Sequence, residues 1–491
     1  MKNIFVSVIV HLIIFSFVAQ AESPLTPLAR NQFKKVTSHN ELLSFVTELS
    51  SLSKKFVVDT IGMSVQGRAI PLVHVTPKGG GEKIKVLLFC QQHGNEASGK
   101  EAALEILQKI AADEKNILYP NIDLYVLPSA NPDGNESGKR ANANKEDLNR
   151  DHVLLSQPET QAIHAAFARI QPEVTLDVHE FSAYRKEFLA AGYVRAVDEQ
   201  FGAPSNLNIP LTIREYGLKK LFPFLETELS KQNLRFSNYL KMDGPGDTVR
   251  PSTTSIDDGR QSLAILNTFS FILEGKNGRS FHDEIKRRTD GQVCAVEAFL
   301  RFADRYSGEI HRLVQNEKKK LLTTGEPVIV RMDYLHSGEN ISLPMKSIAT
   351  DSDTLVSMRS APEVKPLFSV TRPKAYLIPQ SQSAIIELLQ RHGVQMKKIE
   401  TSYVQNVEKY TITNTAPVWM ENKPFINIST QVKNGTMTAK PGDYLVSLSQ
   451  PASTMLVIAL EPASMWGVAQ EESFSALRIL NSEYPIYRIV Q

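Results

Sequence analysis

Short apolar runs alternate with helical patterns along the first 310 residues of the chain. The runs are five or six residues long, rich in Val, Leu, Ile and Phe, and typical of strands buried on both faces. They occupy residues 85–89, 122–127, 174–178 and 269–273. Amphipathic helices are predicted over residues 97–112 and 162–170. The alternation predicts an α/β fold, a mixed, mostly parallel central sheet with helices on both faces.

Two capping-box patterns predict where helices begin. In each, a serine is followed three residues later by a glutamate, so that the two side chains can satisfy backbone N–H groups of the first turn. The two pairs are Ser38 with Glu41 and Ser156 with Glu159. Between them, the apolar segments at 56–58 and 70–73 predict a hairpin.

The pattern changes after about residue 310. A charged stretch leads to short segments of alternating hydrophobicity, such as 328–331 and 444–448, and to one predicted helix at 383–391. This predicts a smaller β-rich C-terminal domain. The chain is therefore divided into an N-terminal segment at 1–21, a large α/β domain at 22–310 and a β-rich accessory domain of unknown role at 311–491.

The first 21 residues have the pattern of a signal peptide. Lys2 precedes an apolar run from Ile4 to Val18, and Ala19-Gln20-Ala21 forms a small-residue cleavage site. The run is shorter than the roughly 20 apolar residues that span a membrane, although an uncleaved anchor helix is the alternative. We expect an exported protein, periplasmic or secreted, with no membrane span in the mature chain.

The composition is that of an ordinary globular protein, with 42% hydrophobic and 22% charged residues among 491. A net charge of +2 gives no reason to expect nucleic-acid binding, which needs a basic face. Two cysteines, Cys90 and Cys294, exclude a disulfide scaffold. Whether they pair stays open, because Cys90 ends an apolar strand where a buried free thiol fits equally well.

Three candidate metal ligands follow the ends of two predicted strands. His93 and Glu96 lie three residues apart at a strand-to-helix turn, and His179 ends another strand. Two imidazoles and a carboxylate suit one zinc ion and leave a tetrahedral position for water, as in catalytic zinc sites. The spacing alone is a weak signal, because it recurs at His336 and Glu339 in a turn that we read as a surface loop.

Two acidic residues accompany these ligands. Asp177 precedes His179 by two residues and is a candidate hydrogen-bond partner behind it. Glu274 ends the apolar run at 269–273. A carboxylate is costly to bury there, and a general base beside a metal-bound water would explain its presence. A structural salt bridge is the alternative.

The loop after the strand at 122–127 carries several cations. It begins with the turn at 131–134 and contains Lys139, Arg140, Lys145 and Arg150. Arginine binds carboxylates bidentately and stabilises oxyanions. Four cations in one loop also fit a solvated face, but the expected position of this loop beside the strand that precedes His93 favours a role in the site.

Taken in order along the chain, these residues resemble the zinc carboxypeptidase family, often called the M14 peptidases. The resemblance rests on His93, Glu96, Asn131-Pro132-Asp133-Gly134, Arg140, Asn149, Arg150, His179 and Glu274. Residues 61–68 also resemble the entry hairpin of that family, and the match covers roughly residues 35 to 310. Each motif is modest alone, whereas their joint occurrence in the family's order is specific.

The resemblance implies a role for each matched residue. His93, Glu96 and His179 would bind one zinc ion. Glu274 would be the catalytic base, Arg140 would stabilise the oxyanion, and Asn149 and Arg150 would bind the terminal carboxylate of the substrate.

The sequence departs from the pancreatic type of this family. That type carries a tyrosine somewhat before the catalytic glutamate, and this chain has no tyrosine between Leu240 and Glu274. The substrate-capping step is therefore in doubt. Arg260 lies in this interval and is a candidate contact for an acidic substrate group, with a surface ion pair as the alternative.

We therefore expect a zinc metallocarboxypeptidase that hydrolyses the C-terminal amide bond of peptides with a free terminal carboxylate. Cell-wall peptides are one candidate substrate class, because the chain is expected to be exported. One alternative is a zinc amidase or deacylase of N-acyl amino acids. The other is a non-catalytic peptide-binding protein of the same fold.

Overall fold

The computed structural model describes residues 23–76, 81–113, 118–421 and 423–490. The predicted signal peptide at 1–21 lies outside the described residues. In the part of the chain that is described, no helix has the length and apolar character needed to cross a membrane.

An eight-stranded mixed sheet forms the centre of the first half of the chain. In spatial order its strands are β1 (Phe56–Met63), β2 (Ala69–Val75), β4 (Ile122–Leu127), β3 (Ile84–Cys90), β5 (Val174–Phe181), β10 (Phe269–Lys276), β7 (Glu199–Gly202) and β8 (Phe236–Asn238). The central strands β4, β3, β5 and β10 are parallel to one another, whereas β1, β2 and β7 add antiparallel pairs. The predicted mixed, mostly parallel α/β sheet is confirmed.

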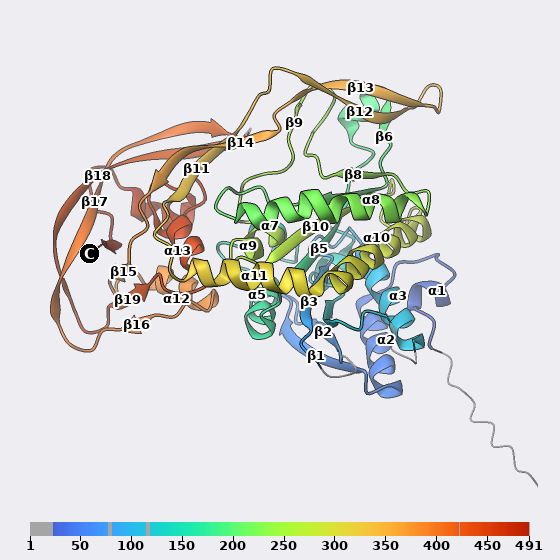
Figure 1. Cartoon of the computed structure of the whole chain (residues 1–491), viewed down its shortest axis with the longest axis horizontal. Helices are drawn as coiled ribbons and strands as arrows, with labels where there is room; N and C mark the ends of the chain where they lie inside the picture. Colours follow the sequence, from blue (N-terminus) through green and yellow to red (C-terminus); the bar gives the residue numbers. More distant parts are fainter. Residues whose placement is uncertain (1–22, 77–80, 114–117, 422, 491) are drawn as a thin grey trace, which may run out of the picture.

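Helices cover both faces of this sheet, as the apolar runs predicted. One face packs against α2 (His39–Leu52), α3 (Ser98–Ala112), α8 (Phe222–Ser230), α10 (Ile285–Arg305) and α11 (Ser307–Leu321). The other packs against α5 (Pro158–Ile170) and α9 (Gly259–Ala264). Alternate side chains of β3 enter the two cores, with Leu88 on the first face and Phe89 on the second. In Figure 1, α8, α10 and α11 lie in front of the sheet.

Shorter helices connect these elements. They are α1 (Pro27–Arg30), α4 (Pro132–Ser137), η1 (Leu148–Arg150), α6 (Lys186–Ala190), α7 (Leu211–Tyr216) and η2 (Gly217–Leu221). The capping box of Ser38 and Glu41 is confirmed at the start of α2. The second predicted capping box is wrong, because α5 begins at Pro158 and the Ser156 hydroxyl donates to Asp151 instead.

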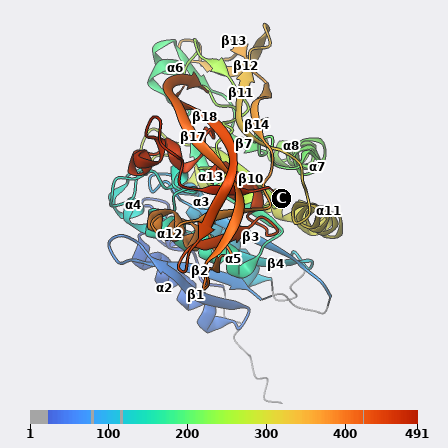
Figure 2. The same cartoon turned by 90° about the vertical axis from the view of Figure 1, so that its left-hand side faces the viewer.

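The C-terminal region contains two further sheets. One pairs β11 (Val328–Leu335) with β14 (Glu363–Val370). The other has the order β16 (Lys397–Lys398), β19 (Tyr444–Ser447), β15 (Ala375–Ile378), β20 (Tyr487–Ile489), β17 (Tyr403–Met420) and β18 (Lys423–Ala439). The helical segments are α12 (Ser383–Arg391), α13 (Ser453–Leu460), η3 (Val468–Gln470) and η4 (Glu472–Arg478). The long β17–β18 hairpin in Figure 2 differs from the short strands expected, because its mixed polar and apolar faces give no single alternating pattern.

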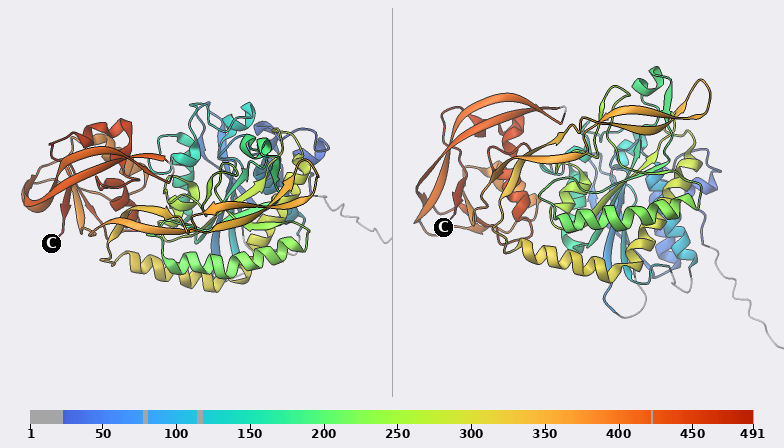
Figure 3. Two further views of the ribbon diagram at one scale, coloured as in Figure 1. Left: turned by 90° about the horizontal axis from the view of Figure 1, so that it is seen from above. Right: turned by 45° about the horizontal axis from the view of Figure 1, so that its top comes forward.

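One sheet joins the two halves of the chain. The hairpin of β12 (Asn340–Ser347) and β13 (Asp353–Ser360) pairs with β6 (Tyr193–Arg195) on one side and β9 (Thr248–Val249) on the other. Figure 3 shows this hairpin extending across the first half of the molecule. The domain division at residue 310 stays a prediction, and strands from after that residue complete a sheet begun before it.

Candidate active site

The polar residues singled out by the sequence meet at the carboxyl ends of the central parallel strands. Strands β3, β5 and β10 are adjacent and run in the same direction, so their ends share one edge of the sheet. His179 on β5 stands directly beside Glu274 on β10 in the strand register. His93 and Glu96 lie in the turn between β3 and α3 at the same edge.

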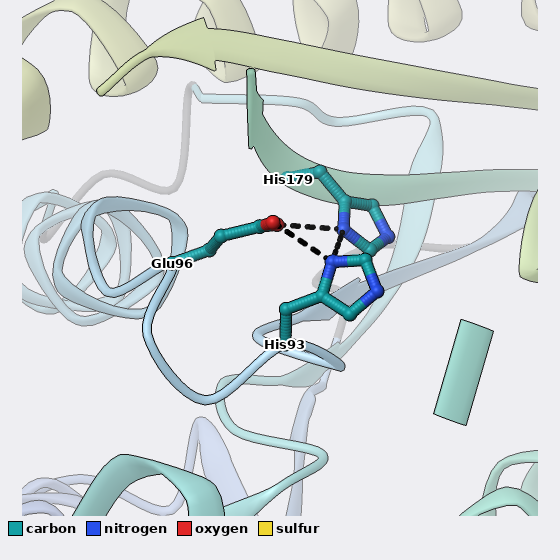
Figure 4. A group of neighbouring side chains, drawn as sticks. All are labelled: His93, Glu96 and His179. Carbon is teal, nitrogen blue, oxygen red and sulfur yellow. Dashed lines mark hydrogen bonds and ion pairs between the residues drawn. The ribbon is translucent and has the colours of Figure 1, made fainter. Parts of the chain in front are cut away.

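His93, Glu96 and His179 form a compact, buried group (Figure 4). His93 Nδ1 lies 2.8 Å from Glu96 Oε1, and His179 Nδ1 lies 2.9 Å from Glu96 Oε2. The two Nδ1 atoms are 3.0 Å apart. Three ligand atoms at these separations surround a point that each can reach, which is the arrangement that a tetrahedral metal ion requires.

The far nitrogens of both rings are held by carboxylates. His93 Nε2 donates to Asp147 Oδ1 at 3.0 Å, and His179 Nε2 lies 2.8 Å from Asp177 Oδ1. Because an ionised carboxylate only accepts, each Nε2 carries a hydrogen, so Nδ1, which faces Glu96, is the nitrogen that would bind a metal ion. The donor set of two neutral imidazoles and a carboxylate, backed by carboxylates, fits zinc.

Asp147 belongs to the cationic loop, and no pattern in the sequence indicated its role. Burial by itself would raise the pKa of Asp147, but the hydrogen bond from His93 and the charges of Arg140 and Arg150 hold it well below its ordinary value. Asp147 is therefore ionised and keeps the His93 ring in one orientation.

A strained turn places His93 at the end of β3. Gln91 has φ of 57°, a left-handed conformation that is unfavourable for a residue with a side chain. Its side-chain amide donates to Gly94 O at 2.9 Å and accepts from Ser129 Oγ at 2.7 Å. These buried bonds fix the turn, and such strain is concentrated at functional sites.

Glu274 is the acidic group next to the three ligands. Burial raises the pKa of Glu274 to about 7, and Glu96 adds to the increase while His179 and Arg140 oppose it. The carboxyl group lines the cleft together with His93 and Arg140. A pKa near neutrality suits a group that both accepts and returns a proton.

The predicted substrate-binding residues surround the same cleft. Arg140 is 45% exposed and bonds to Glu96 Oε1 at 3.2 Å and Asp147 Oδ2 at 3.0 Å. Asn149 is buried, with its Oδ1 accepting from Gly259 N at 2.7 Å and its Nδ2 at 3.2 Å from His179 Nε2. Arg150 lies on the exposed side of the cleft. The structure thus brings all three close to the candidate ligands.

Arg260 is also a cleft residue, and it forms an ion pair, as the alternative expected, but in the interior rather than at the surface. Its side chain is buried, with Nη2 at 3.2 Å from Asp258 Oδ2 and 2.5 Å from Ser252 Oγ. The missing side chain of Gly202 makes room for it, because a Cβ there would lie 2.6 Å from Arg260 Nη1. Arg260 is therefore neutralised by the protein itself.

Three cleft residues were missed by the sequence analysis. Tyr239, Arg195 and Lys241 line this cleft of about 410 Å³. Tyr239 lies one position before the interval searched for a tyrosine, and burial followed by the charge of Glu274 raises its pKa to about 12. Arg195 sits on a strand of three residues that carries no recognisable pattern. The sequence signal that could have indicated Arg195 and Lys241 is the number of cationic residues near the ends of predicted strands.

The two cysteines are free in the structure. Cys90 is buried at the end of β3, and burial raises the pKa of its thiol well above the ordinary value. Cys294 lies on α10 and is half-buried. Among the described residues, the group that could hold a metal ion consists of His93, Glu96 and His179 and includes neither cysteine.

Comparison with known proteins gives a consistent picture. Residues 42–186 match the family model described as zinc carboxypeptidase, Peptidase_M14. The chain is 26% identical over 451 residues to Carboxypeptidase 2 of Trichophyton rubrum, a match that covers 87% of this chain and 81% of that protein. It is 28% identical over 164 residues to Carboxypeptidase SOL1 of Arabidopsis thaliana, covering 30% of this chain and 33% of that protein.

Solved structures with a related arrangement are more distant. The metallo-carboxypeptidase from Burkholderia cenocepacia is 17% identical, with 56% of this chain and 71% of that chain covered and a TM-score of 0.42. Bovine thrombin-activatable fibrinolysis inhibitor, solved with tick carboxypeptidase inhibitor, is 15% identical, with 56% and 99% covered and a TM-score of 0.43.

Proposed function

We propose that the chain, which is similar to the zinc carboxypeptidases of the M14 family over residues 42–186 and to Carboxypeptidase 2 over most of its length, removes the C-terminal residue of peptides with Glu274 as the general base. The family implies zinc, and one ion would be held by His93, Glu96 and His179. The observation that carries the proposal is the position of Glu274, in register with His179 and facing the same cleft as Arg140.

Zinc, when bound, would supply Lewis acidity, which polarises a carbonyl and lowers the pKa of a bound water to about 7. Glu274 takes a proton from the attacking water as the new C–O bond forms. Arg140 donates hydrogen bonds to the oxygen on which negative charge develops. Glu274 then gives the proton to the leaving nitrogen as the C–N bond breaks, so that the carboxylate is regenerated.

Arg150 and Asn149 would select the end of the peptide. A guanidinium binds a carboxylate through two parallel hydrogen bonds, and Arg150 is exposed on the cleft where a chain end can reach it. Asn149 precedes it and is fixed by its bond from Gly259 N. Arg140 and Arg150 are ten residues apart on one loop, so one segment presents both cations.

The experiment that tests this proposal compares a peptide with its C-terminal amide on zinc-loaded protein. We expect release of the last residue from the free acid and a loss of about 10- to 100-fold in kcat/KM for the amide, the cost of a charge-assisted hydrogen bond. Equal cleavage of acid and amide would contradict the role of Arg150 and would favour an amidase or deacylase.

The Glu274→Gln variant tests the base. We expect kcat to fall by about 10²- to 10⁴-fold, with zinc content and peptide binding retained. The matched control is Glu226→Gln, an exposed glutamate on α8, which should leave kcat unchanged. Peptide binding without turnover under any metal would instead support a binding protein of this fold.

The proposal also concerns the source of the peptide substrate, which can be a protein or the cell wall. We include cell-wall peptides because the predicted signal peptide would take the chain out of the cytoplasm. Incubation with a mixed library of protein-derived peptides and muropeptides, followed by mass spectrometry, separates the two sources. Cleavage confined to the protein-derived peptides would remove cell-wall peptides from the proposal.

A further inference from the structure

Arg195 is a buried cation that faces the cleft, and burial lowers its pKa to about 10 although nearby Tyr239 and Glu274 oppose this decrease. Its side chain is 5% exposed, and its guanidinium lies over the Phe181 ring at 4.3 Å. It lines the cleft together with Glu274 and Tyr239. Over the described residues, the Arg195 side chain makes no hydrogen bond and no ion pair. Such a buried charge is costly unless something compensates for it.

Most of the other cations in the cleft form ion pairs with acidic residues of the protein. Arg140 pairs with Glu96 and Asp147, Arg185 pairs with Asp243 at 2.8 Å, and Arg260 pairs with Asp258. Arg150 is the proposed partner of the terminal carboxylate. Arg195 and Lys241 therefore remain as cleft cations without an ion pair in the described part of the chain.

Lys241, which lines the same cleft, supports the same conclusion. Burial and then the neighbouring charges of Lys423, Arg150 and Arg250 lower the pKa of Lys241 to about 8. A cation whose pKa is lowered by other cations lies in a region of positive potential, and this region opens into the cleft. A substrate with a single carboxylate would bind Arg150 through that group. It would bring no second negative charge to compensate for the positive potential near Lys241.

We propose that the cleft accepts a C-terminal residue with an acidic side chain, and that Arg195, assisted by Lys241, binds the side-chain carboxylate. The proposal rests on the proposed carboxypeptidase function and specifies its substrate class. The substrate then supplies two carboxylates, one for Arg150 and one for Arg195. Ile272 lies on the same face of β10 as Glu274 and offers an apolar surface for the stem of such a side chain.

The backbone of Arg195 is held rigidly for this task. On strand β6, Arg195 pairs with Met345 of β12, which belongs to the C-terminal half. The hairpin packs its apolar side chains against the segment that carries the other cleft residues, since Leu343, Met345 and Met358 share a buried cluster with Met242 and Val249. A binding group on a paired strand is preorganised, so less ordering is needed when the ligand arrives.

The first test uses zinc-loaded full-length protein and blocked tripeptides that differ in their last residue, Glu, Gln, Leu or Lys. Glu and Gln have nearly the same shape, so their comparison isolates the charge. We expect kcat/KM for the Glu peptide to exceed that for the Gln peptide by about 10- to 100-fold, as for a hydrogen bond between charged groups. A preference for Leu or Lys over Glu would overturn the proposal.

The second test uses Arg195→Met, which removes the charge and keeps an apolar stem. The Glu peptide should lose about 10- to 100-fold in kcat/KM, whereas the Gln peptide should change by less than about threefold. An equal loss on both peptides would mean that Arg195 acts on groups common to all substrates, and would overturn the proposal. Arg195→Lys should retain more of the Glu preference than Arg195→Met.

The matched control is Arg301→Met, on the surface of α10, where Arg301 pairs with Glu228 at 3.2 Å. It should leave the ratio between Glu and Gln peptides unchanged. Arg195→Met is expected to fold, with a Tm close to that of the wild type, because the replaced cation has no hydrogen bond and no ion pair in the described protein and an apolar side chain can also pack on Phe181.

Binding to the Glu274→Gln variant separates the two levels of inference. If wild-type protein cleaves no peptide but the variant binds the Glu peptide about tenfold more tightly than the Gln peptide, the proposed function fails and the specificity stands. If peptides are cleaved without distinction between Glu and Gln, the specificity fails and the function stands. Titration calorimetry with both peptides measures this directly.

Discussion

Asp177 and His179 lie two positions apart on β5, and their side chains meet on the same face of the strand, with Asp177 Oδ1 at 2.8 Å from His179 Nε2. The alternation of side chains along a strand makes this contact possible, because residues i and i+2 project to the same side. Gln92 Nε2 donates to the same carboxylate at 2.9 Å. The His179 ring is thereby fixed from behind.

We expect Asp177→Asn to weaken zinc affinity by about 10- to 100-fold, the usual effect of losing a carboxylate behind a ligating histidine. Competition with a chromogenic chelator measures the change. The control is Asp59→Asn, since Asp59 makes a surface ion pair with Arg169. Unchanged zinc affinity in Asp177→Asn would show that the His179 ring does not need this carboxylate to keep its orientation.

Gly94 lies where two loops of the site touch. A Cβ at this position would lie 2.1 Å from the backbone carbon of Gly134 and 2.5 Å from Asn135 N. Backbone atoms cannot rotate away, so Gly94→Ala must separate the turn that carries His93 from the turn at 131–134. We expect a loss of at least about 1–3 kcal/mol of stability and a weaker zinc site.

The control for this substitution is Gly246→Ala, where an added Cβ would meet nothing within 4 Å. Thermal unfolding of the metal-free proteins measures stability, and chelator competition measures zinc binding. A Gly94→Ala protein as stable as Gly246→Ala would contradict the close approach of the two loops.

Three histidines link the two halves of the chain and predict sensitivity to acid. His152 Nδ1 lies 3.0 Å from His164 Nε2, and His392 Nε2 donates to Val153 O at 2.7 Å. Burial lowers the pKa of each ring, that of His392 to about 4. They border a cavity of about 320 Å³ that residues of α5, α11 and α13 also line.

The direction of the pH effect follows from these pKa values. In the unfolded chain a histidine takes up a proton near pH 6.5, whereas the folded His392 stays neutral until about pH 4. The unfolded state therefore binds more protons between these values, and stability falls as pH decreases from 6.5 towards 4. For His392 alone we expect a loss of about 1 kcal/mol between pH 7.5 and pH 5.5.

Calorimetric unfolding at the two pH values checks this expectation. In His392→Gln the stability difference between pH 7.5 and pH 5.5 should shrink by about the same 1 kcal/mol, whatever the absolute stability of the variant. His336→Gln, in the exposed turn between β11 and β12, should leave the difference unchanged. An unaltered difference in His392→Gln would mean that His392 is protonated in the folded protein.

The free thiols give a further prediction. Without reductant, the denatured protein should react with two equivalents of iodoacetamide, because both cysteines are free. In the native protein Cys294 should react first, since Cys90 is fully buried and its thiol is held in the unreactive protonated form. Peptide mapping identifies the labelled residue, and a disulfide-linked peptide pair would contradict the structure.

Much of the central fold could be predicted from hydrophobic patterns. The apolar runs at 85–89, 122–127, 174–178 and 269–273 all became parallel strands, because strands covered on both faces need continuous apolar sequence. Three candidate metal ligands could be found for a related reason. A histidine or carboxylate at the end of such a run stands out against its neighbours, whereas the exposed pair His336 and Glu339 does not follow a buried run that leads into a helix.

The roles of the remaining site residues could not be predicted, because these roles depend on contacts with residues that are distant in the sequence. Arg195 lies on a three-residue strand whose pairing partner is more than a hundred residues away. Asp147 becomes a partner of His93 through the closure of an irregular loop. Ser156 was expected to cap a helix, but Asp151 competes for its hydroxyl. In each case the local sequence admits several outcomes, and distant contacts select one.

The β12–β13 hairpin has a consequence for attempts to obtain a minimal enzyme. Cutting the chain after residue 310 would strip the hydrogen-bonding edges of β6 and β9 and uncover Met242 and Val249. The three candidate metal ligands and Glu274 would remain in the shortened protein. Strand β6, which carries Arg195, would lose its hydrogen-bonded partner strand β12. A chimera that exchanges the C-terminal halves of two relatives would therefore keep Arg195 but replace the strand that pairs with β6, so the proposed preference for acidic residues would depend on a segment that contains none of the candidate catalytic residues.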